Sequence, residues 1–484
     1  MPDGITLAAD LYLPEGAAAS VPARRFPAIL EYTPYHKNNN QAYGPRASRY
    51  PYFASHGYVF VNVDIRGTGD SEGFTASPTS PEEVRDGLEV IRWCARQPWC
   101  DGSVGMIGIS YTAGVCYDAA RQAPEELKAI VVCQMCSDWY EGMAYPGGSP
   151  RPFAHENYAP LMAAYNFAPP DPDLLGARWT EVWQGRLDSS TPWSLAYVEN
   201  ALDGPFWESR LLRGEEERVR AATFLIGGWC DWYPDDMLRV YSRLRCPKRV
   251  LIGPWTHNYP ENAWPLPRIN DRYECLRWFD RHLKGIDTDP EHPLEGEAPV
   301  SLFVREFDPP EPLRHEESGD FRHMADWPPV HVRDWHGYLA EPGCLRLASE
   351  GNTPPGLPPG TTELTYRPDV GVAAGRYAIG QMLPGWGMPG DQRLDEPFSL
   401  LYTTEPLEDG LELLGAPEAR LFLSCTAPVA FLSVKLCDVA RDGTSVLVTK
   451  GVLNLTHRTS HECPEPLTLH RHRATGGEEV GCSG

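Results

Sequence analysis

Short apolar runs alternate with segments of helical periodicity over residues 1–135, and this alternation limits the possible folds most strongly. Four runs are rich in Val and Ile and are bounded by Gly, Pro or Asp, as buried strands are: FPAILEYTP, GYVFVNVDI, SVGMIGIS and LKAIVVCQM. Between them, residues 81–98 carry apolar side chains at helical spacing and begin and end with proline. Strands that alternate with helices form a parallel sheet covered on both faces. The sequence therefore predicts the first part of an α/β core over residues 1–135.

The character of the chain changes three times after this segment. Over residues 136–221, Trp, Tyr, Pro and Asp dominate and strand patterns disappear, which predicts a helical cap inserted over an active site. Strand patterns return in ATFLIGGW and KRVLIGPW, so residues 222–290 are predicted to complete the core. Over residues 291–484, short strands beginning with PVSLFVRE are separated by Pro, Gly and Asp. This pattern is typical of an all-β sandwich or jelly roll.

Composition and charge exclude several classes of protein. The chain has 484 residues with 42% hydrophobic and 23% charged residues, which is ordinary for a globular protein. Its net charge of −23 argues against nucleic acid as a partner, because phosphate binding needs basic patches. No apolar run approaches the ~18 residues that span a bilayer, and no signal peptide is recognisable. We therefore expect a cytoplasmic protein with no membrane attachment.

The cysteines give no sign of a metal site. Thirteen cysteines in a chain without a signal peptide are expected to be reduced thiols. The pair Cys133 and Cys136 continues an apolar strand-like run, and no second pair stands at zinc-binding spacing. We expect no metal and no cofactor, and a homodimer is left open.

The motif GMIGISYTAG is the strongest catalytic signal. Ser110 follows the apolar run Val104–Ile109 and precedes the helix-compatible stretch Tyr111–Arg121. A strand, a sharp turn with serine at its tip and then a helix form the nucleophile elbow of a hydrolase. The pattern is imperfect, because G-x-S-x-G needs glycine where Thr112 stands, and an ordinary strand-to-helix turn is the alternative.

A nucleophilic serine needs a base, and the base needs an acid that orients it. ATFLIGGW leads into Asp231, and KRVLIGPW leads into His257, so both residues follow predicted buried strands. The order Ser110, Asp231, His257 is the order of the triad in α/β-hydrolases. Asp235 and Asp236 compete for the role of the acid, and helix capping is the alternative role for Asp231.

The loop DIRGTGDSEG allows a different interpretation. Gly67 and Gly69 follow a strand, as in a loop that binds a nicotinamide dinucleotide. The third glycine, Gly73, stands one position late, and prolines follow where a helix should begin. A nicotinamide-dependent oxidoreductase is therefore a remote alternative.

Taken together, these segments resemble the cocaine esterase and Xaa-Pro dipeptidyl-peptidase family of serine hydrolases. The resemblance rests on DGITLAADLYLP, EYTPYHK, VNVDIRGTGDSEG, PWCDGSVGMIGISY, GGWCDWY, GPWTHN and DQRLDEPFSLLYTTEPL. It implies an α/β-hydrolase core with a helical cap and a C-terminal jelly roll. It also implies that Ser110 is the nucleophile, Asp231 the acid and His257 the base.

The resemblance extends to the oxyanion donors and to the loop after the second strand run. It implies that the Tyr35 hydroxyl and the Tyr111 backbone N–H hold the oxyanion. It further implies that the DIRGTGDSEG loop buttresses the elbow through Arg66, Asp70 and Ser71. Thr112 and Ala113 stand where family members often have glycine, which is expected to affect rate and substrate size rather than reaction type. Aromatic residues near the predicted strand ends are candidates for an acyl pocket: Trp139, Tyr140, Trp229 and Trp232.

The sequence leaves the substrate class open. The predicted reaction is acyl transfer to water from an ester, an amide or a short peptide. Release of Xaa-Pro dipeptides needs carboxylates for the substrate ammonium group, and the cap offers Asp138, Glu141 and Glu156. Jelly-roll sequence is expected to continue beyond the polar stretch HRHRATGGEEVGCSG, which suggests truncation or a frameshift. A catalytically impaired binding protein on the same fold is therefore an alternative.

Overall fold

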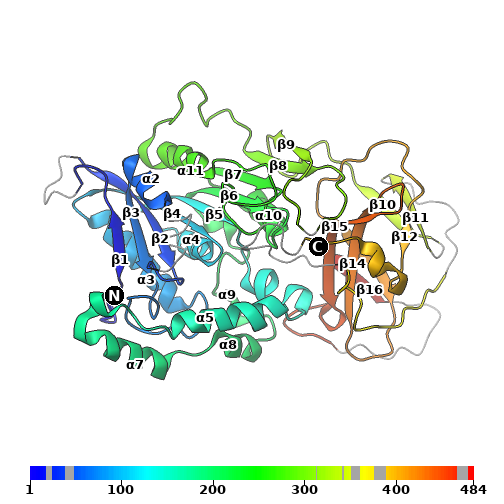
Figure 1. The fold of residues 1–484 in the computed structure, drawn as a ribbon, viewed down its shortest axis with the longest axis horizontal. Helices are drawn as coiled ribbons and strands as arrows, with labels where there is room; N and C mark the ends of the chain where they lie inside the picture. The colour runs from blue at the N-terminus through cyan, green and yellow to red at the C-terminus, as the bar shows by residue number, and fades with distance from the viewer. Residues whose placement is uncertain are drawn as a thin grey trace.

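The computed structural model describes residues 1–17, 24–38, 48–311, 313–340, 343–349, 360–374, 388–465 and 478–483. A nine-stranded sheet with the order β1-β3-β2-β4-β5-β6-β7-β8-β9 forms its centre (Figure 1). The strands are β1 (Ala9–Tyr12), β2 (Phe26–Thr33), β3 (Val59–Asp64), β4 (Cys100–Ile109), β5 (Leu127–Cys133), β6 (Ala222–Gly228), β7 (Lys248–Gly253), β8 (Val300–Arg305) and β9 (Gly319–Met324). Strands β2 to β8 run parallel, and the two edge strands are antiparallel to their neighbours.

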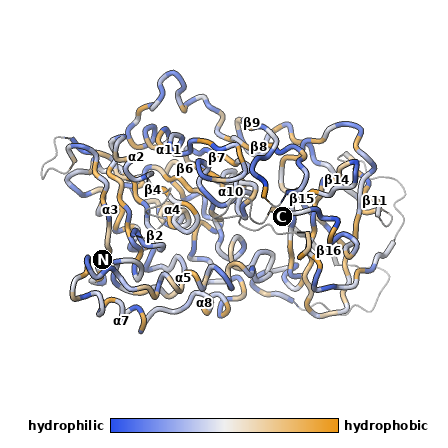
Figure 2. Tube along the Cα trace, viewed as in Figure 1, coloured by the Kyte–Doolittle hydropathy of each residue, from blue (hydrophilic) through white to orange (hydrophobic). Residues whose placement is uncertain are grey.

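Helices cover both faces of this sheet, so β2, β3 and β6 are buried along their whole length. The adjacent residues Ile29 and Leu30 of β2 point into different hydrophobic clusters, one on each face. One cluster receives α3 (Pro81–Arg96), α4 (Tyr111–Arg121) and α10 (Pro234–Arg243), and the other receives α2 (Arg49–Ser55) and α11 (Asp271–Phe279). The hydrophobic colouring accordingly runs along the strands of the sheet (Figure 2).

The cap lies between β5 and β6 in sequence, as expected, and consists of short helices. Its main elements are η1 (Tyr140–Ala144), η3 (Phe153–Tyr158), α5 (Ala159–Asn166), α6 (Pro172–Leu175), α7 (Trp179–Ser189), α8 (Trp193–Glu199) and α9 (Pro205–Glu208). In Figure 1, α5, α7 and α8 extend along one side of the core. No helix in the described ranges is long and apolar enough to cross a membrane.

The C-terminal part is rich in β-structure, as predicted. It contains a three-stranded sheet and two two-stranded sheets within the residues that the structure covers. The strands are β10 (Trp335–Leu339), β11 (Gly343–Ser349), β12 (Tyr402–Thr403), β13 (Glu418–Leu423), β14 (Phe431–Val439), β15 (Ser445–Asn454) and β16 (Glu478–Ser483). This part contacts the cap, because Asn454 Nδ2 donates to the carbonyl of Gly148 over 3.2 Å.

One strand lies in a different sheet from the one the sequence predicted. The run PVSLFVRE, expected to begin the β domain, forms β8 and pairs in parallel with β7 of the central sheet. Its side chains Val300 and Leu302 are fully buried in the core cluster. We propose that the boundary between the hydrolase core and the β domain lies after Met324 rather than at residue 291.

Candidate active site

Ser110 stands at a sharp turn between β4 and α4. Its backbone has φ 60° and ψ −130°, a strained conformation for a residue other than glycine. A Cβ at Gly108 would lie 2.2 Å from the carbonyl of Thr112, so this tight turn requires glycine there. The Ser110 N–H donates to the Cys133 carbonyl over 3.0 Å, while Ser110 Oγ makes no hydrogen bond to any described residue. The strand, the tight turn with serine at its tip and the helix have the geometry expected of a nucleophile elbow.

Thr112 fits this turn without glycine. Its side-chain oxygen both accepts from the N–H of Ile109 and donates to the carbonyl of Ile109, each over 2.8 Å. The side chain is fully buried against the end of β4. The Thr112 side chain therefore joins the first turn of α4 to the end of β4.

Asp231 and His257 lie in the loops that follow β6 and β7, and the structure brings them together. His257 Nδ1 is 2.8 Å from Asp231 Oδ2, and the Asp231 side chain is fully buried. Because a carboxylate can only accept, Nδ1 carries the proton and Nε2 faces away with its lone pair available. The competing carboxylate Asp236 accepts instead from the backbone N–H and the hydroxyl of Ser137.

Gln134 connects the elbow to the histidine loop, and it was not among the predicted site residues. It is fully buried and has a positive φ of 52° directly after β5. Its Nε2 donates to the carbonyls of Thr256 and Asn258, which flank His257, over 3.2 and 3.5 Å. The preceding residue, Cys133, accepts the Ser110 N–H. A chain of three hydrogen bonds thus runs from the nucleophile turn to both sides of the histidine.

Tyr35 lies in the loop after β2, beside the first residue of α4. Its ring meets the Tyr111 ring edge-on at 6.4 Å, and its hydroxyl is 3.0 Å from the Tyr158 hydroxyl of the cap. As the first residue of α4, Tyr111 has a backbone N–H without an acceptor in the helix. The Tyr35 hydroxyl and this N–H are the two donors expected for the oxyanion.

Aromatic side chains of core and cap form a continuous path from His257 to the elbow. The ring centroids of Tyr233 and His257 are 6.0 Å apart, and those of Trp232 and Phe153 of the cap are 4.5 Å apart. Phe153 stacks on Tyr158, which reaches Trp193 and, through it, Tyr111. The path passes from the loop after β6 through the cap and returns to the helix that begins after Ser110. Rings of the cap thus lie along the connection between the His257 loop and the helix after Ser110.

Comparison with known proteins assigns the chain to a family. The model of the X-Pro dipeptidyl-peptidase family S15 matches residues 3–259, and the model of the X-Pro dipeptidyl-peptidase C-terminal non-catalytic domain matches residues 258–471. The chain belongs to the S15 family. It is therefore a hydrolase with the α/β-hydrolase fold, as the resemblance of the sequence implied.

Relatives of this S15 hydrolase carry esterase and peptidase names. A cocaine esterase of Rhodococcus sp. (strain MB1 Bresler) is 28% identical over 95% of this chain and 82% of its own length. An Xaa-Pro dipeptidyl-peptidase of Lacticaseibacillus casei is 24% identical over 85% of this chain but only 51% of its own length. A solved α-amino acid ester hydrolase superimposes with a TM-score of 0.72 at 20% identity, covering 100% of this chain and 84% of that one. At this identity the structural likeness establishes the fold.

The four aromatic residues predicted to line a pocket lie in two environments. In the S15 hydrolase, Trp232 belongs to the aromatic path, and Trp139 meets the Tyr111 ring at 5.5 Å. Tyr140 stacks on Tyr145 of the cap, and the indole of Trp229 donates to the carbonyl of Phe303 in β8. Trp139 and Trp232 thus contact rings of the aromatic path that connects His257 to the elbow helix. Tyr140 and Trp229 have the contacts given above in other parts of the cap and core.

The loop after β3 is folded around a carboxylate rather than around a dinucleotide. A Cβ at Gly69 would lie 2.1 Å from Asp64 Oδ2, so the Asp64 side chain occupies the space inside the loop.

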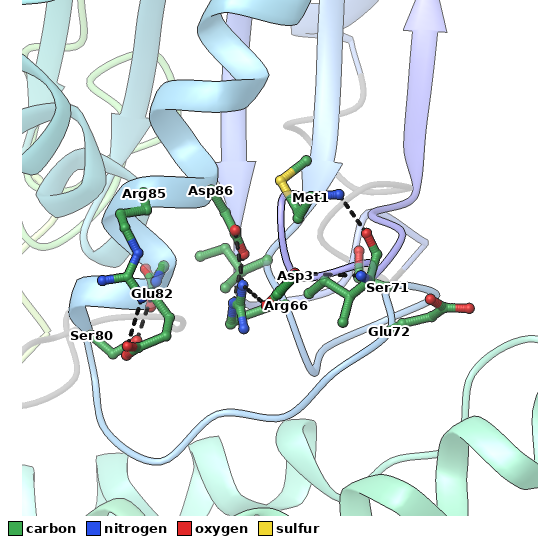
Figure 3. A network of polar contacts seen from close by, with 12 residues as sticks. Met1, Asp3, Arg66, Ser71, Glu72, Ser80, Glu82, Arg85 and Asp86 are labelled. Atoms are coloured by element: carbon green, nitrogen blue, oxygen red, sulfur yellow. Dashed lines mark hydrogen bonds and ion pairs between the residues drawn. The ribbon is translucent and has the colours of Figure 1, made fainter.

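Arg66 does not face the elbow as expected but pairs with Asp86 of α3 and with Asp3 (Figure 3). Ser71 likewise faces β1 and β3, since its hydroxyl accepts from Ala8 and donates to the Asp64 carbonyl.

A buried carboxyl lies behind the elbow helix. The Tyr111 hydroxyl donates to Glu83 of α3 over 2.8 Å, and the other Glu83 oxygen has no hydrogen-bond partner among the described residues. Burial raises the pKa of Glu83 to about 8. The folded protein therefore favours the protonated carboxyl, whereas in the unfolded chain the carboxyl ionises near its ordinary pKa of about 4.3.

This arrangement predicts a pH-dependent loss of stability. The contribution of Glu83 is fully present below about pH 4 and is lost as pH rises toward 8, because only the unfolded chain ionises readily there. In Glu83→Gln this loss is absent, so from pH 5 to pH 8 the free energy of unfolding should fall by roughly 3 kcal/mol less than in the wild type. Urea unfolding at both pH values measures the difference. The exposed neighbour Glu82→Gln is the matched control, and equal pH dependence of Glu83→Gln and the wild type would contradict the prediction.

Proposed function

We propose that this S15 hydrolase cleaves carboxylic esters through an acyl-enzyme on Ser110. The observation that carries the proposal is the hydrogen bond between Asp231 and His257, whose loop is joined to the Ser110 turn through Gln134. Tyr35 and the Tyr111 N–H supply the oxyanion donors in this proposal. The aromatic residues Trp139 and Trp232 belong to the lining of the acyl pocket.

The reaction proceeds in two acyl transfers. His257 Nε2 takes the hydroxyl proton as Ser110 Oγ attacks the substrate carbonyl carbon. The resulting oxyanion receives hydrogen bonds from the Tyr35 hydroxyl and the Tyr111 N–H, and Asp231 stabilises the imidazolium. Collapse of the tetrahedral intermediate breaks the ester C–O bond, and the leaving alcohol takes the proton from His257. Water then attacks the acyl-enzyme by the same route and releases the acid and the free Ser110 hydroxyl.

The cap supports a neutral ester better than a peptide with a free ammonium group. Asp138 caps the N–H of Tyr140 and lies 3.4 Å from the Arg213 guanidinium. Glu141 accepts from the Gly147 N–H, and Glu156 is exposed on the cap surface. Asp138 and one oxygen of Glu141 thus already have partners within the protein, whereas the other Glu141 oxygen is buried, has no hydrogen-bond partner among the described residues and lies 3.7 Å from His461 Nε2. The cocaine esterase relative, which covers most of this chain, points to the same bond type.

The aromatic path favours an acyl group with a flat apolar surface. Phe153 stacks on Tyr158, and the Tyr158 ring lies next to Trp193, so aromatic rings of the cap follow one another between the His257 loop and the elbow helix. Rings of this kind bury apolar area and stack on an aromatic acid. A benzoate ester is therefore the expected probe of choice over an acetate ester.

The test compares three chromogenic substrates under the same conditions. We expect turnover of p-nitrophenyl benzoate with a higher kcat/KM than p-nitrophenyl acetate, and little or no turnover of Ala-Pro-p-nitroanilide. A higher kcat/KM for the anilide than for either ester would overturn the ester assignment. If the folded wild-type protein turned over none of the three substrates, the result would favour a catalytically impaired binding protein instead.

A further inference from the structure

The short segment that carries Tyr35 is held in place by contacts from outside the segment. His36 has a positive φ of 65°, a backbone conformation that residues other than glycine adopt uncommonly and at a cost in energy. His36 Nε2 lies 2.9 Å from the Tyr165 carbonyl of the cap, and the Tyr35 hydroxyl contacts Tyr158. The position of the Tyr35 hydroxyl therefore depends on what holds the next residues.

Lys37 is the anchor on the core side. Its backbone N–H donates to Asp64 Oδ1 over 2.5 Å, and its ammonium group lies 2.7 Å from Asp70 Oδ2. The side chains of Lys37 and Asp70 are only 2% and 5% exposed, so water screens this ion pair little. Asp64 Oδ2 accepts the Asp70 N–H over 2.8 Å. The two oxygens of Asp64 therefore hold the backbone of both Lys37 and Asp70.

Asp70 also reaches the cap. Its Oδ1 accepts the N–H of Asp171, at the start of α6, over 2.8 Å. On either side of Asp70, the buried guanidinium of Arg186 from α7 donates to the carbonyls of Gly69 and Ser71 over 2.6 Å each. The Asp70 carboxylate thus contacts the segment that carries Tyr35 with one oxygen and the cap with the other. Arg66 and Ser71 of the same loop face α3 and β1 instead (Figure 3).

We infer that Asp70 is a positioning residue for Tyr35, which couples the seating of the cap to the geometry of the oxyanion hole. The inference rests on the proposed oxyanion role of Tyr35. In the absence of the Lys37–Asp70 pair, the strained turn at His36 relaxes and the Tyr35 hydroxyl moves from the site where oxyanion charge develops. Such a shift reduces the stabilisation of the transition state and leaves the binding of the substrate in its ground state largely unchanged.

The test is a double-mutant cycle on p-nitrophenyl benzoate hydrolysis with Asp70→Asn and Tyr35→Phe. Asp70→Asn should lower kcat by about tenfold to a hundredfold, with KM changed by less than about twofold. In the Tyr35→Phe background, the same substitution should lower kcat by less than about twofold, because no hydroxyl remains to be positioned. Asp10→Asn is the matched control, since Asp10 lies 3.4 Å from the same ammonium group but is 38% exposed. It should leave kcat unchanged.

The outcomes test the oxyanion role of Tyr35 and the positioning role of Asp70 separately. If Tyr35→Phe leaves kcat unchanged, the oxyanion role of Tyr35 is wrong and the inference falls with it. If Tyr35→Phe lowers kcat but Asp70→Asn lowers it equally in both backgrounds, only the positioning role is overturned. Should Asp70→Asn fail to fold, Lys37→Met/Asp70→Asn removes both charges together, and the same cycle with Tyr35→Phe applies.

Discussion

Replacement of Ser110 by alanine should lower kcat/KM for p-nitrophenyl benzoate by about 10⁴-fold to 10⁶-fold. The substitution removes the only atom that forms the acyl-enzyme bond in the proposed mechanism. Ser110 Oγ makes no hydrogen bond to a described residue, so its removal breaks no contact that the structure shows. The fold and the melting temperature should therefore be nearly unchanged.

Ser55→Ala serves as the matched control for this experiment. Ser55 is an exposed serine at the end of α2, far in sequence from the elbow, and its hydroxyl contacts the Tyr52 carbonyl and the His56 ring nitrogen Nδ1. Its replacement should leave kcat/KM within about twofold of the wild type. Ester hydrolysis by Ser110→Ala at the rate of the control would exclude Ser110 as the nucleophile.

Asp231→Asn should lower kcat by about 10³-fold to 10⁴-fold, the second-largest effect expected. Asparagine keeps the shape of the side chain, but its amide can donate to Nδ1 and so favour the wrong tautomer of His257. It also removes the negative charge that stabilises the imidazolium formed when Ser110 attacks. KM should change far less than kcat, because Asp231 binds His257 and has no contact with the substrate in the proposed mechanism.

The neighbouring Asp235→Asn distinguishes the acid from its competitor. Asp235 stands in the first turn of α10 and contributes to the helix N-terminus rather than to His257. Its replacement should leave kcat within about twofold of the wild type. A larger loss in Asp235→Asn than in Asp231→Asn would show that the acid was assigned to the wrong carboxylate.

The triad candidates could be predicted because they depend on local pattern and chain order. Ser110, Asp231 and His257 each follow an apolar run, and the carboxyl ends of parallel strands lie along one edge of a sheet. Tyr35 could be predicted only from the family resemblance, since a tyrosine after a strand carries no chemical signal of its own. Gln134 was missed because its role depends on two backbone carbonyls more than 120 residues away in sequence.

The membership of β8 in the central sheet could not be predicted for a related reason. A short apolar strand followed by polar turns looks the same whether it pairs with a core strand or with a β domain. Pairing is decided by the buried surface next to β7, which the strand covers with Val300 and Leu302. Likewise, Arg66 was expected at the elbow, but Asp86 on the neighbouring helix binds it in the structure.

Identification of the residue modified by a fluorophosphonate probe tests the central claim most directly. The folded wild-type protein is treated with the probe, digested, and the adduct is located by mass spectrometry. We predict one phosphonylated residue, Ser110, with modification slowed strongly in Asp231→Asn and absent in Ser110→Ala. An adduct on another residue, or no adduct on well-folded wild-type protein, would contradict the assignment of Ser110 as the nucleophile of an active hydrolase.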